Sequence, residues 1–292
     1  VPVLPPGTPR RTPTDAPQSV LPRATRQQAM TATEVEDTRH LQLVRAAGVK
    51  PEPVRWLLHH LIPQAAVTLL AGREGLGKST MWAHWAAEAT HGRLPGDMLG
   101  TPTDVLVIAN EDSREHTLTP RLIAAGADLE RVHFVDAATL TGTTSVMLPL
   151  DGARLVQAIR ATEAALVIVD PLVSVLDGRL DSHKDHSIRQ ALDPLNSVAS
   201  STGAALLGLV HLNKAQGSDV LDRVLGSRAF TAAARAVLAM TLDPHDDSGR
   251  LLVFQSKSNL GPRTREALVV EVQAVTIETS SGPTEVGRAV IV

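Results

Sequence analysis

The sequence lacks cysteine altogether, and this absence excludes disulfide bonds, zinc–thiolate sites and thiol chemistry. Aromatic residues are scarce, with three Trp, three Phe and no Tyr among 292 residues, which argues against a surface that stacks the bases of a single strand. The chain also lacks a charge excess of either sign. Its net charge of −3 exerts no general pull on nucleic acid, so any such contact must come from a local patch.

A long hydrophobic run is missing as well. The longest apolar stretch, residues 164–176, is interrupted by Asp170 and Pro171 and is too short for a membrane span. The N-terminus has no apolar segment of the kind found in signal peptides. These absences predict a cytoplasmic protein without a membrane partner. The first residue is Val rather than Met, which indicates a fragment or a non-AUG start codon.

What the sequence does contain is a phosphate-binding loop. Residues 72–79 read GREGLGKS, a complete match to the pattern G-x-x-x-x-G-K-[ST]. We expect its glycines to adopt positive φ, Lys78 to reach the β- and γ-phosphates, and Ser79 to ligate Mg²⁺. An apolar run precedes the loop and a helix-forming run follows it, which favours this interpretation over a plain Gly-rich turn. The predicted nucleotide-binding residues are Gly72, Arg73, Glu74, Gly75, Leu76, Gly77, Lys78, Ser79 and Thr80.

The order of elements predicts an α/β fold. Residues 1–40, rich in Pro and Arg, are expected to form a disordered tail, more readily a solvated linker than a nucleic-acid-binding arm, and residues 41–292 a single domain. Apolar strands alternate with helices up to about residue 237, which is typical of a mostly parallel sheet flanked by helices. The expected strands of this part are 41–44, 67–71, 105–110, 132–135, 165–170 and 204–211, and the expected helices are 79–90, 117–125, 152–161, 187–201 and 228–237. Strands alone follow, at 251–256, 268–272, 275–278 and 288–292, and we expect them to extend the same sheet in antiparallel fashion.

Three polar residues follow predicted strands. Asp170 ends the strand ALVIVD and has the form of a Walker B carboxylate that holds Mg²⁺, although it could instead cap a turn. Pro171 takes the place where several motor ATPases carry a catalytic glutamate. We therefore assign the base to Glu111, at the end of the strand after the loop's helix and expected beside the loop strand, with helix capping by Glu111 and Asp112 as the alternative. His211 ends a further strand and is equally consistent with a phosphate sensor and a structural histidine.

These segments, in the order GREGLGKST, ANEDS, LVIVDPL, LVHLNK, GSRAFTAAARAVL and QSKSNLGP, resemble the RepA-like ATPases of the RecA fold, hexameric replicative helicases and their AAA-type relatives. The resemblance covers about residues 41–280 and implies ATP and Mg²⁺ as ligands and a homo-hexameric ring as the assembly. It implies Lys78, Glu111 and His211 as catalytic residues of one subunit. It further implies Arg235 as an arginine finger that reaches the ATP of the next subunit, with Arg228 as its rival, and a weaker nucleotide contact from Arg121.

The expected function depends on a loop after the His211 strand. Residues 215–224 correspond to a segment that faces the pore in helicases, but they carry two Asp and one Arg and are not basic. One reading is a ring ATPase acting on single-stranded DNA, as a helicase or a loader. A second is a switch or assembly ATPase without helicase action. A small-molecule kinase is disfavoured because no Arg-rich lid lies between the two Walker motifs.

Overall fold

The computed structural model describes residues 43–140, 142–176, 185–212 and 228–292, and it divides the chain into the units Val1–Glu52 and Pro53–Val292. The described part of the first unit contains one short 3₁₀ turn, Ala46–Gly48. The prediction of a strand at 41–44 is wrong for residues 43 and 44, the two that the structure describes. Leu43 and Val44 are exposed and outside any strand, because no neighbouring strand pairs with them. Residues 1–40, the expected tail, lie outside the described residues.

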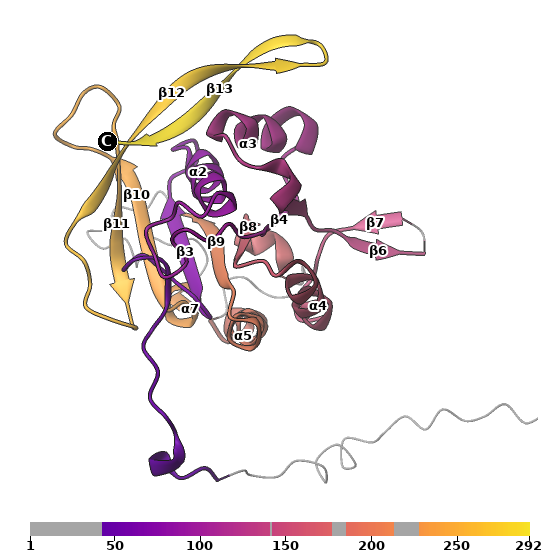
Figure 1. The fold of residues 1–292 in the computed structure, drawn as a ribbon, viewed down its shortest axis with the longest axis vertical. Helices are drawn as coiled ribbons and strands as arrows, with labels where there is room; N and C mark the ends of the chain where they lie inside the picture. Colours follow the sequence, from indigo (N-terminus) through magenta and orange to yellow (C-terminus); the bar gives the residue numbers. More distant parts are fainter. Residues whose placement is uncertain (1–42, 141, 177–184, 213–227) are drawn as a thin grey trace, which may run out of the picture. The chain divides into compact units, whose positions relative to one another are not determined.

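The second unit is built on a nine-stranded sheet with the order β13-β12-β11-β10-β3-β9-β8-β4-β5 (Figure 1). The strands from β10 to β5 run parallel, and β11, β12 and β13 continue the sheet antiparallel. This arrangement confirms the predicted α/β fold and its antiparallel extension. The nine strands are β3 (Val67–Gly72), β4 (Val105–Ala109), β5 (Val132–Phe134), β8 (Leu166–Asp170), β9 (Ala205–His211), β10 (Ala236–Leu242), β11 (Leu251–Ser258), β12 (Ala267–Thr279) and β13 (Gly282–Ile291).

Helices cover both faces of the sheet (Figure 1). They are α2 (Lys78–Thr90), α3 (Thr119–Ala125), α4 (Gly152–Thr162), α5 (Asp185–Thr202) and α7 (Arg228–Ala233). Alternate residues of each strand face opposite sides, so Leu70 of β3 packs in the core beneath α2, whereas Leu69 and Ala71 pack in the core shared with α5 and α7. Because both faces are covered, every residue of β3 is buried, which explains why all of them except Thr68 are apolar or glycine. No helix among the described residues is long and apolar enough to span a membrane.

Two predictions about the C-terminal part are wrong. The helix expected at 228–237 ends at Ala233, and Ala236–Leu242 forms strand β10 between β3 and β11. The Ala-rich sequence favours a helix locally, but pairing with two neighbouring strands overrides that preference. The strands expected at 268–272 and 275–278 are one continuous strand, β12.

Two small hairpins accompany the sheet. β1 (Trp56–Leu58) and β2 (Ile62–Pro63) lead into the phosphate-loop strand. β6 (Ala137–Thr139) and β7 (Gly142–Thr144) form a second hairpin after β5, which the sequence pattern did not indicate. The long hairpin of β12 and β13 packs over α2 and α3 and so brings C-terminal residues to the phosphate loop (Figure 1).

Candidate nucleotide-binding site

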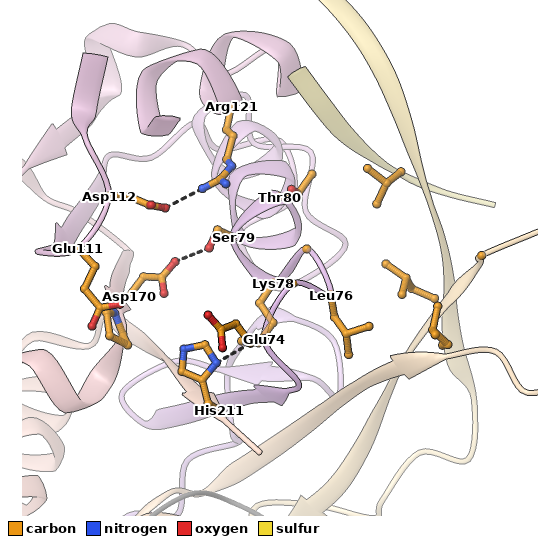
Figure 2. Close-up of a pocket in the computed structure, with 17 residues that line it drawn as sticks. Glu74, Leu76, Lys78, Ser79, Thr80, Glu111, Asp112, Arg121, Asp170 and His211 are labelled. Atoms are coloured by element: carbon orange, nitrogen blue, oxygen red, sulfur yellow. Dashed lines mark hydrogen bonds and ion pairs between the residues drawn. The ribbon is translucent and has the colours of Figure 1, made fainter. Parts of the chain in front are cut away.

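A cavity of about 700 Å³ lies beside the phosphate loop, at the carboxyl ends of β3, β9, β8 and β4. Its volume is that of a small-molecule site, and the carboxyl edge of the parallel strands is where open α/β sheets bind ligands. One end is polar and the other is aliphatic (Figure 2).

The phosphate loop joins β3 to α2 and lines the cavity from Glu74 to Thr80. Gly75 and Gly77 have φ of 77° and 82°, as predicted for residues that turn the backbone around an anion. Gly72 is different, because its φ is not positive. A Cβ there would lie 3.1 Å from the carbonyl oxygen of Met240, so this glycine allows a close approach to β10.

The N-terminus of α2 is open to an anion. Gly77 precedes the helix without a side-chain cap, and no acidic residue occupies the first turn. The first backbone N–H groups of a helix have no partner within the helix, and the helix dipole adds positive potential there. Among the described residues no side chain caps this helix end, so the loop and the helix can hold a phosphate there.

Lys78 is buried and turned back onto the protein. Its Nζ donates hydrogen bonds to the carbonyl oxygens of Gly72 at 3.0 Å and Arg73 at 2.9 Å, and lies 3.2 Å from Nδ1 of His211. Burial lowers the pKa of Lys78, and the carboxylates of Asp170 and Glu74 oppose that shift. An incoming phosphate would supply a negatively charged hydrogen-bond partner for this buried ammonium, which now bonds to carbonyl oxygens.

His211 ends β9 at the level of Gly72 in the adjacent strand. A charged lysine can only donate hydrogen bonds, so in this contact a protonated Lys78 would use Nδ1 of His211 as the acceptor. The structure thus brings His211 to the phosphate end of the cavity, in contact with the loop lysine (Figure 2).

Asp170 accepts two hydrogen bonds from α2 on the same oxygen. Oδ2 receives the Ser79 hydroxyl at 2.7 Å and the indole Nε1–H of Trp82 at 2.8 Å. The alternative of turn capping is not realised, because the next 3₁₀ turn, Leu172–Val175, has Pro171 at its N-cap and no side-chain cap. Trp82 was not identified from the sequence, although its spacing of three residues from Ser79 places both on one helix face.

The donor set at Asp170 fits Mg²⁺. It consists of a carboxylate and a hydroxyl, hard oxygen ligands that Mg²⁺ prefers, and both line the cavity. No group of three or more His, Asp or Glu residues suited to a metal occurs in the described segments. Such a sparse set agrees with a cation that takes most of its ligands from nucleotide phosphates and water.

Glu111 follows β4 and lines the same cavity. The expected adjacency of β4 to the loop strand is wrong, since β9 and β8 lie between them. Glu111 still reaches the site because β4 pairs with β8, with Ala109 opposite Asp170. It is exposed and makes no ion pair or hydrogen bond with the described residues.

The neighbours of Glu111 have other roles. Asp112 pairs with Arg121 at 2.8 Å, so the charge of Arg121 is already compensated at the cavity wall. The next helical turn is capped by Ser113, whose hydroxyl accepts from the backbone N–H of His116. The alternative in which Glu111 and Asp112 serve as caps is therefore not realised.

Arg235 lies at the opposite side of the sheet from the cavity, where the amino ends of the parallel strands meet, just before β10. Its backbone N–H donates to the carbonyl of Val67, five residues before Gly72 on β3, and its side chain is exposed. At a strand rise of about 3.3 Å per residue, the two ends are roughly 16 Å apart, so Arg235 does not serve its own cavity. The side chain of its rival Arg228 and residues 215–224 lie outside the described part of the chain.

Lys257 of β11 pairs with Val237 of β10, two residues after Arg235. Its Nζ donates to the carbonyl oxygens of Thr231 at 2.5 Å and Ala234 at 2.9 Å, at the end of α7. Burial, and secondarily the charge of Arg235, lowers the pKa of Lys257. This contact anchors the turn from which Arg235 projects.

The aliphatic end of the cavity was not predicted. Its side chains are Leu76 of the loop and Leu242, Leu251 and Val272 of β10, β11 and β12. Three of the four follow the loop by more than 160 residues, and only the folded sheet brings them together.

A phosphate loop after one parallel strand, an acidic residue after a second, and this strand order together define a nucleotide-binding P-loop ATPase of the RecA-like class. The family model AAA_25, described as an AAA domain, matches residues 25–217, and the chain belongs to this family. A comparison with curated proteins found no match.

Proposed function

We propose that the protein is an ATP-hydrolysing motor that works as a ring of identical subunits, most simply a homo-hexamer acting on single-stranded DNA as a RepA-like helicase or replication ATPase. The position of Arg235 supports this proposal. It is an exposed cation without a carboxylate partner among the described residues, at the sheet edge remote from its own cavity. In a head-to-tail ring, each Arg235 would face the ATP of the neighbouring subunit.

In this proposal the phosphate end of the cavity performs the chemistry. The loop N–H groups hold the phosphates, and Lys78 exchanges its carbonyl contacts for phosphate oxygens. Ser79 and Asp170 hold Mg²⁺, which would neutralise charge on the phosphates. Glu111 orients and deprotonates the attacking water, a role that requires a carboxylate without an internal partner.

His211 and Arg235 complete the proposed cycle. His211 contacts Lys78, so movement of Lys78 toward the nucleotide would release the end of β9 and signal that the γ-phosphate is present. Arg235 of the adjacent subunit would stabilise the charge that develops on the transferred phosphoryl group. Each site would then be active only between two subunits.

The aliphatic end of the cavity suits the ribose and base. The described side chains there offer no hydrogen-bond donor or acceptor to a base edge. Binding of the base would rest on apolar contact, so we expect weak discrimination between ATP and GTP.

The decisive experiment measures ATPase activity with and without single-stranded DNA, together with the mass of the assembly by native mass spectrometry. We expect a ring in the presence of nucleotide and faster turnover with DNA. A protein that stays monomeric and whose ATPase rate ignores DNA would contradict the proposal.

The alternative is a nucleotide-dependent switch or assembly ATPase without strand separation. It is favoured by the scarcity of aromatic residues and by the two Asp residues in the loop 215–224. A strand-displacement assay distinguishes the two, because only the motor separates a forked duplex at the expense of ATP.

A further inference from the structure

We propose that Trp82 is a positioning residue for the metal site, whose indole N–H fixes the carboxylate of Asp170 for Mg²⁺·ATP. This inference rests on the proposed binding of Mg²⁺·ATP at the cavity and adds a residue that no sequence motif assigns. Trp82 itself does not line the cavity and acts only through Asp170.

The side chains of Ser79, Trp82 and Asp170 are joined by hydrogen bonds. Ser79 and Trp82 are three residues apart on α2 and approach Asp170 from the same helix face. Both donate to Oδ2, at 2.7 and 2.8 Å, whereas Oδ1 receives no hydrogen bond from the described residues. The two donors restrict rotation of the carboxylate and leave Oδ1 free of protein donors.

The bond from Trp82 is short and charge-assisted, which makes it stronger than a bond between neutral groups. In the proposed site the Ser79 hydroxyl also binds Mg²⁺. Its hydrogen bond to the carboxylate of Asp170 would therefore change when the cation binds, so Ser79 alone would not hold the carboxylate in one orientation. The indole of Trp82 is fully buried in the core, where close packing restricts its rotation. Trp82 is the donor that holds Asp170 in place when Ser79 engages the metal.

Trp85 provides an internal comparison. It lies one turn further along α2, is equally buried, and its Nε1 has no hydrogen-bond partner in the described part of the chain. Burial in this core therefore does not by itself give an indole a partner. The contact between Trp82 and Asp170 is a specific one.

The test uses W82F, which keeps an aromatic ring and removes the N–H, with W85F as the matched control for the loss of buried volume. Equilibrium binding of a fluorescent ATP analogue is measured with Mg²⁺ and with EDTA. We expect W82F to keep the affinity measured in EDTA and to lose about tenfold of the gain that Mg²⁺ provides. W85F should keep the full gain.

Equal Mg²⁺-dependent gains in W82F, W85F and the wild type would overturn the role of Trp82 and leave the proposed function intact. Absence of nucleotide binding by the wild-type protein would overturn both. The two failures are thus distinguishable.

A second measurement covers the case in which W82F does not fold. The protein has three indoles, so ¹⁵N-labelled tryptophan gives three Nε1–H resonances. We expect D170A to shift the resonance of Trp82 strongly, expose it to faster hydrogen exchange, and leave that of Trp85 unchanged. A Trp82 resonance that ignores D170A would also overturn the proposal.

Discussion

At the carboxyl edge of the parallel strands, one cavity gathers Lys78, Ser79, Asp170 and Glu111. At the amino edge, Arg235 precedes β10, and Lys257 pairs with Val237 near the start of that strand. At the carboxyl edge, the carboxylate of Glu111 has no partner among the described residues. At the amino edge, the cations Arg235 and Lys257 form no ion pair with a carboxylate in the described part of the chain. The two edges are complementary but roughly 16 Å apart within one subunit. The proposal that each site is shared between two subunits rests on this difference.

The largest loss of activity is expected from a substitution in the phosphate loop, at the carboxyl edge. We expect Lys78→Ala to abolish turnover and to weaken ATP binding by about 2–5 kcal/mol, because a buried cation facing the phosphates is lost. Equilibrium dialysis with labelled ATP measures the binding. A variant that binds ATP like the wild type would show that the loop is not the phosphate site.

The next largest effect is expected at the amino edge. Arg235→Ala should leave ATP binding intact and lower turnover by about 10³–10⁵-fold, the range found for arginine fingers. Mixing it with Lys78→Ala should restore part of the activity, because a mixed assembly contains sites with an intact loop and an intact finger. If every co-assembled mixture is inactive, the two edges do not cooperate between subunits.

A third substitution separates binding from chemistry within the carboxyl edge. We expect Glu111→Gln to bind ATP normally and to hydrolyse it about 10²–10⁴-fold more slowly, since the amide cannot accept the water proton. Single-turnover hydrolysis measures the chemical step directly. Wild-type hydrolysis in this variant would assign the base to another residue.

The smallest effect is expected from a substitution at the amino edge that disturbs the turn before Arg235. Lys257→Met removes two hydrogen bonds that anchor the turn before Arg235, so we expect turnover to fall about tenfold with unchanged ATP affinity. Arg263→Met is the matched control, because Arg263 bonds to a single exposed carbonyl of the same strand. A loss of ATP affinity in Lys257→Met would mean that the edges are coupled within one subunit.

Much of the fold could be predicted because its strands are buried on both faces and read as apolar runs, as β3, β8 and β9 do. β10 could not, since its Ala-rich sequence favours a helix and only its place between β3 and β11 makes it a strand. Its assignment requires knowledge of pairing, which local sequence does not contain.

The polar end of the site could be predicted residue by residue, because each side chain follows a recognisable strand. Lys78, Asp170, Glu111 and His211 all meet in one cavity (Figure 2). The expected position of Glu111 beside the loop strand was wrong, since β9 and β8 separate β4 from β3. The aliphatic wall and Trp82 were missed because their roles arise from contacts between residues distant in sequence.

The wall residue Val272 belongs to β12, and the hairpin that carries it is the last element of the chain as given. During synthesis the phosphate loop emerges from the ribosome long before this hairpin does. A nascent chain would therefore carry a loop able to meet phosphates but no finished pocket for the rest of the nucleotide. Tight retention of ATP would begin only once the hairpin of β12 and β13 has packed against α2 and α3, so incomplete chains would release the nucleotide readily.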